Sequence, residues 1–414
     1  MKDEIINHLN EPGQLEKMYR TNRFTFKQEF GLLYPTLKGN PVADFWNERL
    51  NYKSDESYKG TGKELLFIII AALVAGLIAK LPTFLALNEE SFYQRNIGFI
   101  IFPVLSAYFA WKNKLSTGKI AFITATTLTG LIFINLLPQV KKSDTLVLSC
   151  IHLLLFLWSI LGFAFVGEHR NNDEKRLGYL RYNGDLVVMT TLILIAGGLM
   201  TAITIGLFSL IGFNIEKYYF DYVGIFGLSA APIVGTYLVQ TNPQLVGRVS
   251  PVIARLFSPL VLVMLVIYLL AIVYSGKSPY TDREFLLMFN ALLIGVMAII
   301  FFSIAETAKN TTKSTEIWVL FLLSVVTIVL NGIALSAILF RISEWGITPN
   351  RAAVMGGNVL ILIHLILVTL KLYRVLAKKS DINGVGKVIA FYLPVYCAWT
   401  IIVTFIFPFI FGYK

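Results

Sequence analysis

The chain has little charge, few cysteines and few histidines for its length. Charged residues occupy 15% of its 414 positions, and there are two cysteines and four histidines. Soluble domains typically carry about 25% charged residues, so this sequence is too poor in charge for a water-soluble fold of its size. Both cysteines, Cys150 and Cys397, fall inside apolar runs, where a thiol packs as a small apolar group. We therefore exclude a disulfide framework and a cysteine-based metal site.

Catalytic motifs are missing as well. The chain has no H-E-x-x-H pair, no G-x-S-x-G elbow and no paired-carboxylate motif. The segment Gly60-Thr-Gly-Lys63 resembles the end of a phosphate-binding loop, but Ser57 replaces the upstream glycine and Glu64 replaces the following Ser or Thr. His152 and His364 each stand alone in an apolar run, without the spacing of paired metal ligands. We expect neither an enzyme nor a cofactor.

The sequence is rich in long apolar runs. Hydrophobic residues make up 56% of the chain, and the mean hydropathy is +0.68. A helix needs about 20 such residues to cross the hydrocarbon of a bilayer. Runs near that length occur at 65–87, 95–111, 119–138, 145–166, 185–212, 220–240, 256–275, 285–305, 317–339, 352–373 and 388–411. We predict an all-α, polytopic transmembrane helix bundle of about eleven spans, with the lipid bilayer as its main partner. The second run is the shortest, and Pro232 interrupts the sixth.

The first 62 residues have a different composition from the rest. We predict a small helical cytoplasmic segment with a polar tether at 1–62 and the transmembrane bundle at 63–414. Residues 14–33 have helical spacing of apolar side chains that ends at Pro35, and a second helix begins near Pro41. That second helix should present Val42, Phe45, Trp46 and Leu50 on one face. Helices this short bury little by themselves, so we expect the segment to lean on the membrane surface or the inner loops.

The net charge of +11 belongs to the membrane part, because residues 1–64 contain equal numbers of basic and acidic side chains. Alternate loops differ in Lys and Arg: sixteen fall in 112–119, 167–184, 241–255, 306–316 and 371–387, against nine in the other loops and the carboxyl-terminal tail. Cytoplasmic loops carry the excess of positive charge. This predicts a cytoplasmic amino terminus and an extracytoplasmic carboxyl terminus, with no nucleic-acid partner.

The most polar connection between two long runs is Arg341-Ile-Ser-Glu-Trp-Gly-Ile-Thr-Pro-Asn-Arg351. Thr348 is suited to cap the next helix and Pro349 to its first position. Arg341 and Glu344 stand three apart, close enough to pair, while Arg351 falls in the first turn, where backbone N–H groups favour anions. Two interpretations follow. The stretch forms an anion-binding mouth, or its charges lock the ends of two spans together.

Uncharged polar residues lie on the same two runs. Asn331, Asn358 and His364 fall within hydrocarbon, where polar groups are costly and mark functional sites. Single interhelical hydrogen bonds also account for lone asparagines and histidines. We expect any polar, outward-facing pocket to lie between the ninth and tenth spans and to be lined by Arg341, Glu344, Arg351, Asn331, Asn358 and His364. Lys80, in the first run, should extend to the outer surface.

Four segments resemble an uncharacterised family of bacterial multi-span inner-membrane proteins. They are Leu15-Glu-Lys-Met-Tyr-Arg20, Leu33-Tyr-Pro, Gly39-Asn-Pro-Val-Ala-Asp-Phe-Trp-Asn-Glu-Arg-Leu50 and the Arg341–Arg351 block. The last matches the pattern R-x-x-E-[WY]-G-[IL]-T-P-N-R, and the amino-terminal segments are similar to those of Bacteroidota-like relatives. The resemblance covers most of the chain and implies a bacterial cytoplasmic membrane. It implies no activity and no catalytic residues.

Two functions remain open from the sequence. In the first, the bundle is a permease or transporter of a small solute that enters the polar pocket near the ninth and tenth spans. In the second, it is a membrane-embedded sensor or accessory subunit whose residues 1–60 recruit a protein partner through Phe45 and Trp46.

Overall fold

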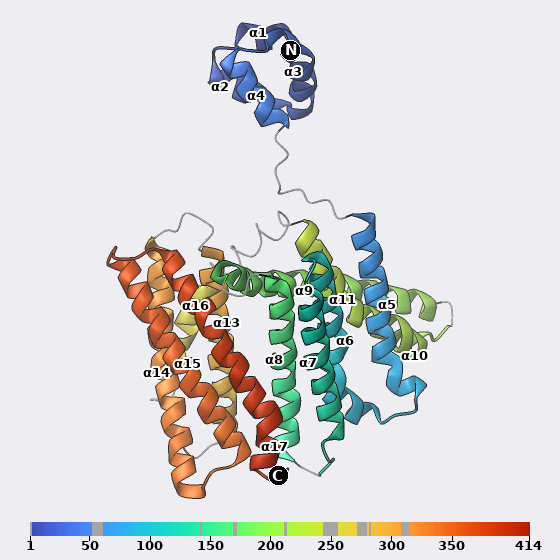
Figure 1. Ribbon diagram of the computed structural model, residues 1–414, viewed down its shortest axis with the longest axis vertical. Coiled ribbons are helices and arrows are strands. Elements are labelled where there is room, and N and C mark those ends of the chain that lie inside the picture. The colour runs from blue at the N-terminus through green and yellow to red at the C-terminus, as the bar shows by residue number, and fades with distance from the viewer. Residues whose placement is uncertain are drawn as a thin grey trace. The chain divides into compact units, whose positions relative to one another are not determined.

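The computed structural model describes residues 2–51, 61–140, 143–168, 172–210, 213–242, 256–270, 280, 283–307 and 314–414. Every regular element in these residues is a helix (Figure 1), which confirms the predicted all-α class. Contacts divide the chain into two units, Met1–Tyr58 and Lys59–Lys414. The sequence places the boundary between 62 and 63, close to this division.

Four short helices form the first unit: α1 (Lys2–Asn7), α2 (Pro12–Thr21), α3 (Arg23–Leu37) and α4 (Pro41–Asn51). The helix expected over 14–33 is divided at Asn22, whose side chain accepts a hydrogen bond from Thr25 N and caps α3. Pro35 does not end α3, which continues to Leu37. A proline in the last turn removes one backbone hydrogen bond, and the helix tolerates that loss so near its end.

The first unit has its own apolar core. Ile5, Leu15, Phe26 and Phe30 are fully buried, and the Trp46 ring lies 5.2 Å from that of Phe26. The expectation that these helices are too short to bury a core is therefore wrong, because aromatic side chains fill the space between them. Of the four residues expected on one face of α4, Val42, Trp46 and Leu50 do face this core, and Phe45 does not. Trp46 is 2% exposed and belongs to this core, whereas Phe45 is 62% exposed.

Within the described residues, each of the eleven apolar runs lies on a helix of the second unit; the ends of two runs, 211–212 and 271–275, fall outside these residues. The helices are α5 (Gly62–Phe84), α6 (Glu89–Lys112), α7 (Thr117–Leu136), α8 (Asp144–Val166), α9 (Asp173–Leu210), α10 (Glu216–Tyr218) continuing through η1 (Tyr219–Gly224) into α11 (Ile225–Thr241), an unlabelled helix Leu256–Leu270, α13 (Arg283–Thr307), α14 (Ser314–Trp345), α15 (Pro349–Leu376), and α16 (Ile382–Ile401) continuing through η2 (Ile402–Ile406) into α17 (Phe407–Ile410). Pro232 lies inside α11 without ending it.

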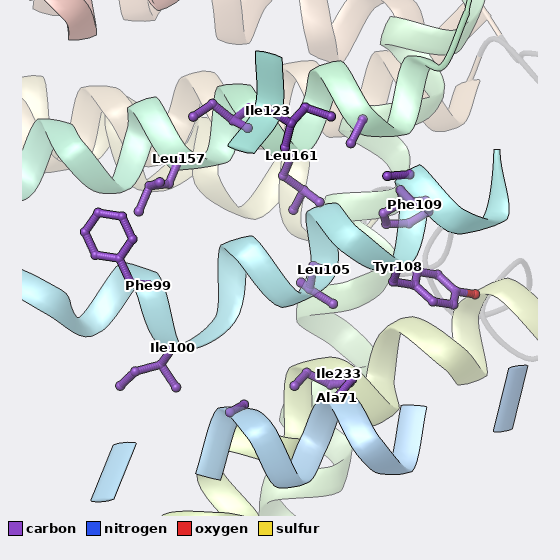
Figure 2. Close-up of a cluster of buried hydrophobic side chains, with 14 of the residues drawn as sticks. Ala71, Phe99, Ile100, Leu105, Tyr108, Phe109, Ile123, Leu157, Leu161 and Ile233 are labelled. Atoms are coloured by element: carbon purple, nitrogen blue, oxygen red, sulfur yellow. The ribbon is translucent and has the colours of Figure 1, made fainter. Parts of the chain in front are cut away.

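Nine of the helices in the described part of the chain are long and apolar enough to cross a membrane. The two remaining apolar runs fall on Leu256–Leu270, which is shorter, and on α6, which is long but begins with polar residues. Side chains of α6 are nevertheless central to one core: Figure 2 shows Phe99, Ile100, Leu105, Tyr108 and Phe109 among Ala71, Ile123, Leu157, Leu161 and Ile233 of α5, α7, α8 and α11. Protein, rather than lipid, covers much of α6, so it does not need an apolar surface all round.

The bundle contains two main apolar clusters. One joins α5 to α9 with α11, and the other joins Leu256–Leu270 with α13 to α16. At one end Ser143 Oγ donates to Tyr413 O at 2.9 Å, and at the other Lys119 Nζ lies 3.1 Å from Glu168 Oε2. If successive helices cross the bilayer in alternating directions, the two segments joined by each contact lie at the same end of the bundle. The carboxyl terminus accordingly lies at the end that holds the α7–α8 and α14–α15 connections (Figure 1).

Candidate functional site

The Arg341–Arg351 connection begins on α14 and ends on α15. Helix α14 continues through Arg341 to Trp345, and Gly346 turns the chain with φ +73°. Thr348 Oγ1 accepts a hydrogen bond from Arg351 N at 3.3 Å, and Pro349 takes the first position of α15. The cap and the helix start therefore agree with the sequence prediction.

Both arginines of this connection bind backbone carbonyls. Arg341 Nε donates to Tyr280 O at 3.0 Å. Arg351 Nη1 donates to Trp345 O at 3.0 Å and to Gly346 O at 2.7 Å. The two guanidinium carbons lie 5.8 and 5.6 Å from the centre of the Trp345 ring, within the range of cation–π attraction. This geometry favours the second interpretation, in which the arginines lock helix ends.

Glu344 does not take part in that lock. Its side chain is exposed at the end of α14, and within the described part of the chain it forms no ion pair with Arg341 or Arg351. The i, i+3 pairing expected for Arg341 and Glu344 is therefore wrong. The carbonyl of Tyr280 has replaced the carboxylate as the partner of Arg341 Nε, since it meets the buried face of α14 where Arg341 is 7% exposed.

Three asparagines from three helices meet inside the bundle. Asn331 of α14 is fully buried and donates through Nδ2 to Asn358 O of α15 at 3.1 Å. Asn358 Nδ2 in turn donates to Asn290 Oδ1 of α13 at 2.7 Å. Asn331 Oδ1 has no hydrogen-bond partner among the described atoms. A buried polar group left in this state costs about 1–3 kcal/mol, which a purely structural contact does not require.

His364 of α15 forms a second polar contact in the same half of the bundle. Its Nδ1 lies 3.0 Å from Tyr396 Oη of α16, and its ring stacks on Tyr392 with centroids 4.3 Å apart. Tyr396 Oη also lies 3.4 Å from Met297 Sδ of α13. His364 is fully buried, and its Nε2 has no partner among the described atoms. The imidazole is thus held by aromatic walls with one nitrogen unsatisfied.

The six predicted site residues therefore fall into two groups. Asn331 and Asn358 touch, and His364 follows Asn358 on α15 by about 9 Å of helix rise. Arg341, Glu344 and Arg351 lie at the helix ends: Arg341 is about 15 Å of rise beyond Asn331 on α14, and Arg351 is about 10 Å before Asn358 on α15. Sequence reasoning missed the links to Asn290, Tyr392 and Tyr396. Asn290 carried the same signal as the other asparagines, a lone amide in an apolar run, but pattern alone does not pair helices.

Three polar residues elsewhere in the bundle contact other helices. Lys80 is 3% exposed, and its Nζ lies 4.8 Å from the Tyr222 ring, so the expectation that it extends to the outer surface is wrong. The ring of Tyr222, a residue of η1, covers the ammonium group of Lys80. Asn96 of α6 and Asn135 of α7 exchange reciprocal amide hydrogen bonds of 3.1 and 2.8 Å. These contacts hold helices together.

Among the described residues, no three His, Cys, Asp or Glu side chains gather closely enough to hold a metal ion. In comparisons with known proteins, no protein-family model matches the chain, and no curated protein or solved structure is significantly similar to it.

Proposed function

We propose that this multi-span membrane protein is a permease for a small, uncharged polar solute, with α13 to α16 lining the path. The observation that carries the proposal is the buried polar row formed by Asn290, Asn358, Asn331 and His364. Two atoms of this row have no partner among the described residues. A passing solute that donates to Asn331 Oδ1 and His364 Nε2 would supply the missing hydrogen bonds.

The absence of charge along the same helices favours a neutral solute. Residues 289–305, 317–340, 352–370 and 388–410 contain no Asp, Glu, Lys or Arg. An ion would meet no opposite charge within the hydrocarbon there, and its desolvation would be uncompensated. Amides, an imidazole and phenols can instead replace the water around a hydroxyl- or amide-bearing molecule. The Trp345 lock with Arg341 and Arg351 then lies at the entrance of the path and fixes its outer end.

Proteoliposome permeability tests the proposal. Purified protein is reconstituted, and shrinkage and recovery after osmotic shock are followed with glycerol, erythritol and urea as probes. Asn331→Leu keeps the number and branching of the side-chain heavy atoms and removes both the unsatisfied Oδ1 and the Nδ2 hydrogen bond to Asn358 O. We expect it to slow permeation of the transported probe at least tenfold and to change the free energy of unfolding little, because loss of the unpaired oxygen offsets loss of the hydrogen bond.

Asn135→Leu is the matched control. It also removes an amide that bonds a neighbouring helix, through the Asn96–Asn135 pair in the other half of the bundle, where Asn96 is buried and Asn135 is exposed. We expect it to lower stability and leave the rate per folded molecule unchanged. The proposal fails if protein-containing and empty liposomes show the same rates for all probes, or if both variants reduce the rate equally.

A second function rests on the first unit. A surface groove of about 530 Å³ there is lined by Glu16, Arg20, Arg49 and Phe45, and Phe45 is largely exposed. Apolar side chains beside charged ones are typical of protein contact sites. If this unit recruits a partner, removal of residues 1–58 will abolish any phenotype that the full-length protein confers on cells and leave liposome permeability intact. Loss of permeability on the same deletion contradicts this division of roles.

A further inference from the structure

A cavity of about 310 Å³ lies between α8, α9 and α16, apart from the polar row. Its walls are mostly aromatic and aliphatic, and they include Trp158, Phe163, Tyr179, Leu393 and Pro394. Gly162 keeps one wall open, because a Cβ at this position would lie 2.8 Å from Tyr179 Cε1.

Hydrogen bonds hold the walls in place. Tyr179 Oη donates to Trp158 O at 2.7 Å, and Trp158 Nε1 donates to Asn183 Oδ1 at 2.9 Å. Cys397 Sγ donates to Ser159 Oγ at 3.1 Å. The polar groups of the walls therefore satisfy one another, and the rings face the space between the helices. An apolar chain would fit this lining better than a polar molecule.

The end of the cavity near the α8–α9 connection is basic. Arg176 is the charged residue among the described residues that line it. Val166 and Gly167, at the end of α8, line the same region, whereas Ser159 lies about 12 Å of helix rise further in. One cation thus stands at the helix end, at the level where headgroups lie, with apolar walls beneath it.

Neighbouring charges have partners of their own. Lys119 Nζ donates to Gly167 O at 2.7 Å and lies 3.1 Å from Glu168. The N–H of Ser116 and the ammonium of Lys119 lower the pKa of the Glu168 carboxyl, so it is ionised at neutral pH. Asp173 lies 3.9 Å from Arg176, a long contact between partly exposed groups that is weak in water. An anion at Arg176 competes with this contact.

We propose that this cavity binds an anionic phospholipid, with its phosphate on Arg176 and part of one acyl chain between Trp158 and Leu393. A guanidinium can hold a phosphate through two parallel hydrogen bonds. Charge complementarity at the rim and apolar walls within match the two ends of such a molecule. A free phosphate would leave the apolar walls uncovered, and a lipid without net charge would gain less from Arg176.

Lipid titration of the purified protein in detergent, followed by native mass spectrometry, tests the assignment. The probes are phosphatidylglycerol, phosphatidylcholine and inorganic phosphate. We expect tighter binding of phosphatidylglycerol than of phosphatidylcholine, and a loss of that preference by about tenfold in Arg176→Gln, equivalent to one charged hydrogen-bonded contact. Arg176→Lys should retain part of it. Arg374→Gln is the matched control, because Arg374 is an exposed arginine in the last turn of α15 and does not line the cavity.

Thiol labelling locates the bound lipid. In a Cys150→Ala background, Cys397 is the remaining thiol and lines the cavity. Phosphatidylglycerol should slow its alkylation by a maleimide several-fold, and Arg176→Gln should remove this protection. Equal protection by phosphatidylcholine, or equal binding to Arg176→Gln, would overturn the headgroup assignment. Protection by inorganic phosphate alone would show a small-anion site in place of a lipid site.

Discussion

Buried charged side chains in the bundle bind polar groups of neighbouring helices. Glu64 of α5 is fully buried, yet it accepts hydrogen bonds from Tyr108 Oη at 2.5 Å and Lys112 Nζ at 3.1 Å of α6. Arg95 is 7% exposed and donates to Ile134 O and Leu137 O at the end of α7. Such residues are explained by their partners. Asn331 Oδ1 and His364 Nε2 have no hydrogen-bond partner among the described residues, as is also true of Thr190 Oγ1 and Thr404 Oγ1, but Asn331 and His364 lie on the adjacent helices α14 and α15.

The pH dependence of the first unit should depend on Glu16. The hydrogen bond from Arg20, together with the positive charge of Arg49, lowers the pKa of the Glu16 carboxyl below its ordinary value. A depressed carboxyl pKa contributes stability that is present above the unfolded-state pKa of about 4.3 and is lost as the pH falls through the folded-state pKa.

Thermal unfolding of residues 1–58, which have their own core, measures this effect. We expect Glu16→Gln to lower the melting temperature at pH 7 and to approach the wild-type value as the pH falls through the lowered folded-state pKa of Glu16, below which both side chains are neutral. Glu11→Gln is a suitable control, because Glu11 is exposed and its partner at 3.0 Å is His8 rather than an arginine. A difference between wild type and Glu16→Gln that does not shrink as the pH is lowered would contradict the electrostatic explanation.

At the scale of elements, helix positions follow from the sequence better than helix contacts do. Apolar runs of about 20 residues identify the spans because each crosses the same thickness of hydrocarbon. The α14–α15 connection is also predictable, since Thr348, Pro349 and Gly346 each have a local conformational reason. The burial of Trp46 is not predictable, because it depends on α2 and α3 folding back over α4. Similarly, nothing in an isolated run indicates that Asn290 meets Asn358.

The lock at the end of α14 can be tested by Arg351→Ala. The substitution removes donors to Trp345 O and Gly346 O and one of the cations against the Trp345 ring. We expect a loss of about 1–2 kcal/mol in the free energy of unfolding, measured in mixed micelles, because these contacts are partly exposed. Glu344→Gln should have no effect on stability.

The same variants distinguish the lock from an anion-binding mouth. If the arginines are structural, Arg351→Ala leaves permeability per folded molecule within twofold of wild type. If they bind an anion, Arg351→Ala instead impairs an anion-dependent activity while the unfolding free energy stays constant. That second outcome would restore the interpretation that the observed hydrogen bonds disfavour.

At the scale of the whole molecule, the number of crossings determines where the chain ends lie. An odd number of crossings, such as eleven, places the two ends in different compartments. In the described part of the chain, nine helices are long and apolar enough to cross by themselves. Whether α6 and Leu256–Leu270 also cross depends on how far other helices cover their surfaces. Contacts between connections fit the alternation, since Ser143 meets Tyr413 and Lys119 meets Glu168. They do not identify which end faces the cytoplasm. That assignment comes from the excess of Lys and Arg in one set of loops.

Reporter fusions test this sidedness. We expect a fluorescent protein to be active when fused at the amino terminus or after Lys379, in the α15–α16 loop. We expect alkaline phosphatase to be active when fused after Gly346 or after Lys414. The physical reason is that Lys371, Arg374, Lys378 and Lys379 resist translocation, while the two arginines of the α14–α15 connection are bound to backbone carbonyls and lie against the Trp345 ring. If both chain ends report the same compartment, one helix does not cross. Fusions on either side of α6 and of Leu256–Leu270 would then show which helix does not cross. If that helix is α6, Arg341 and Arg351 lie on the cytoplasmic side.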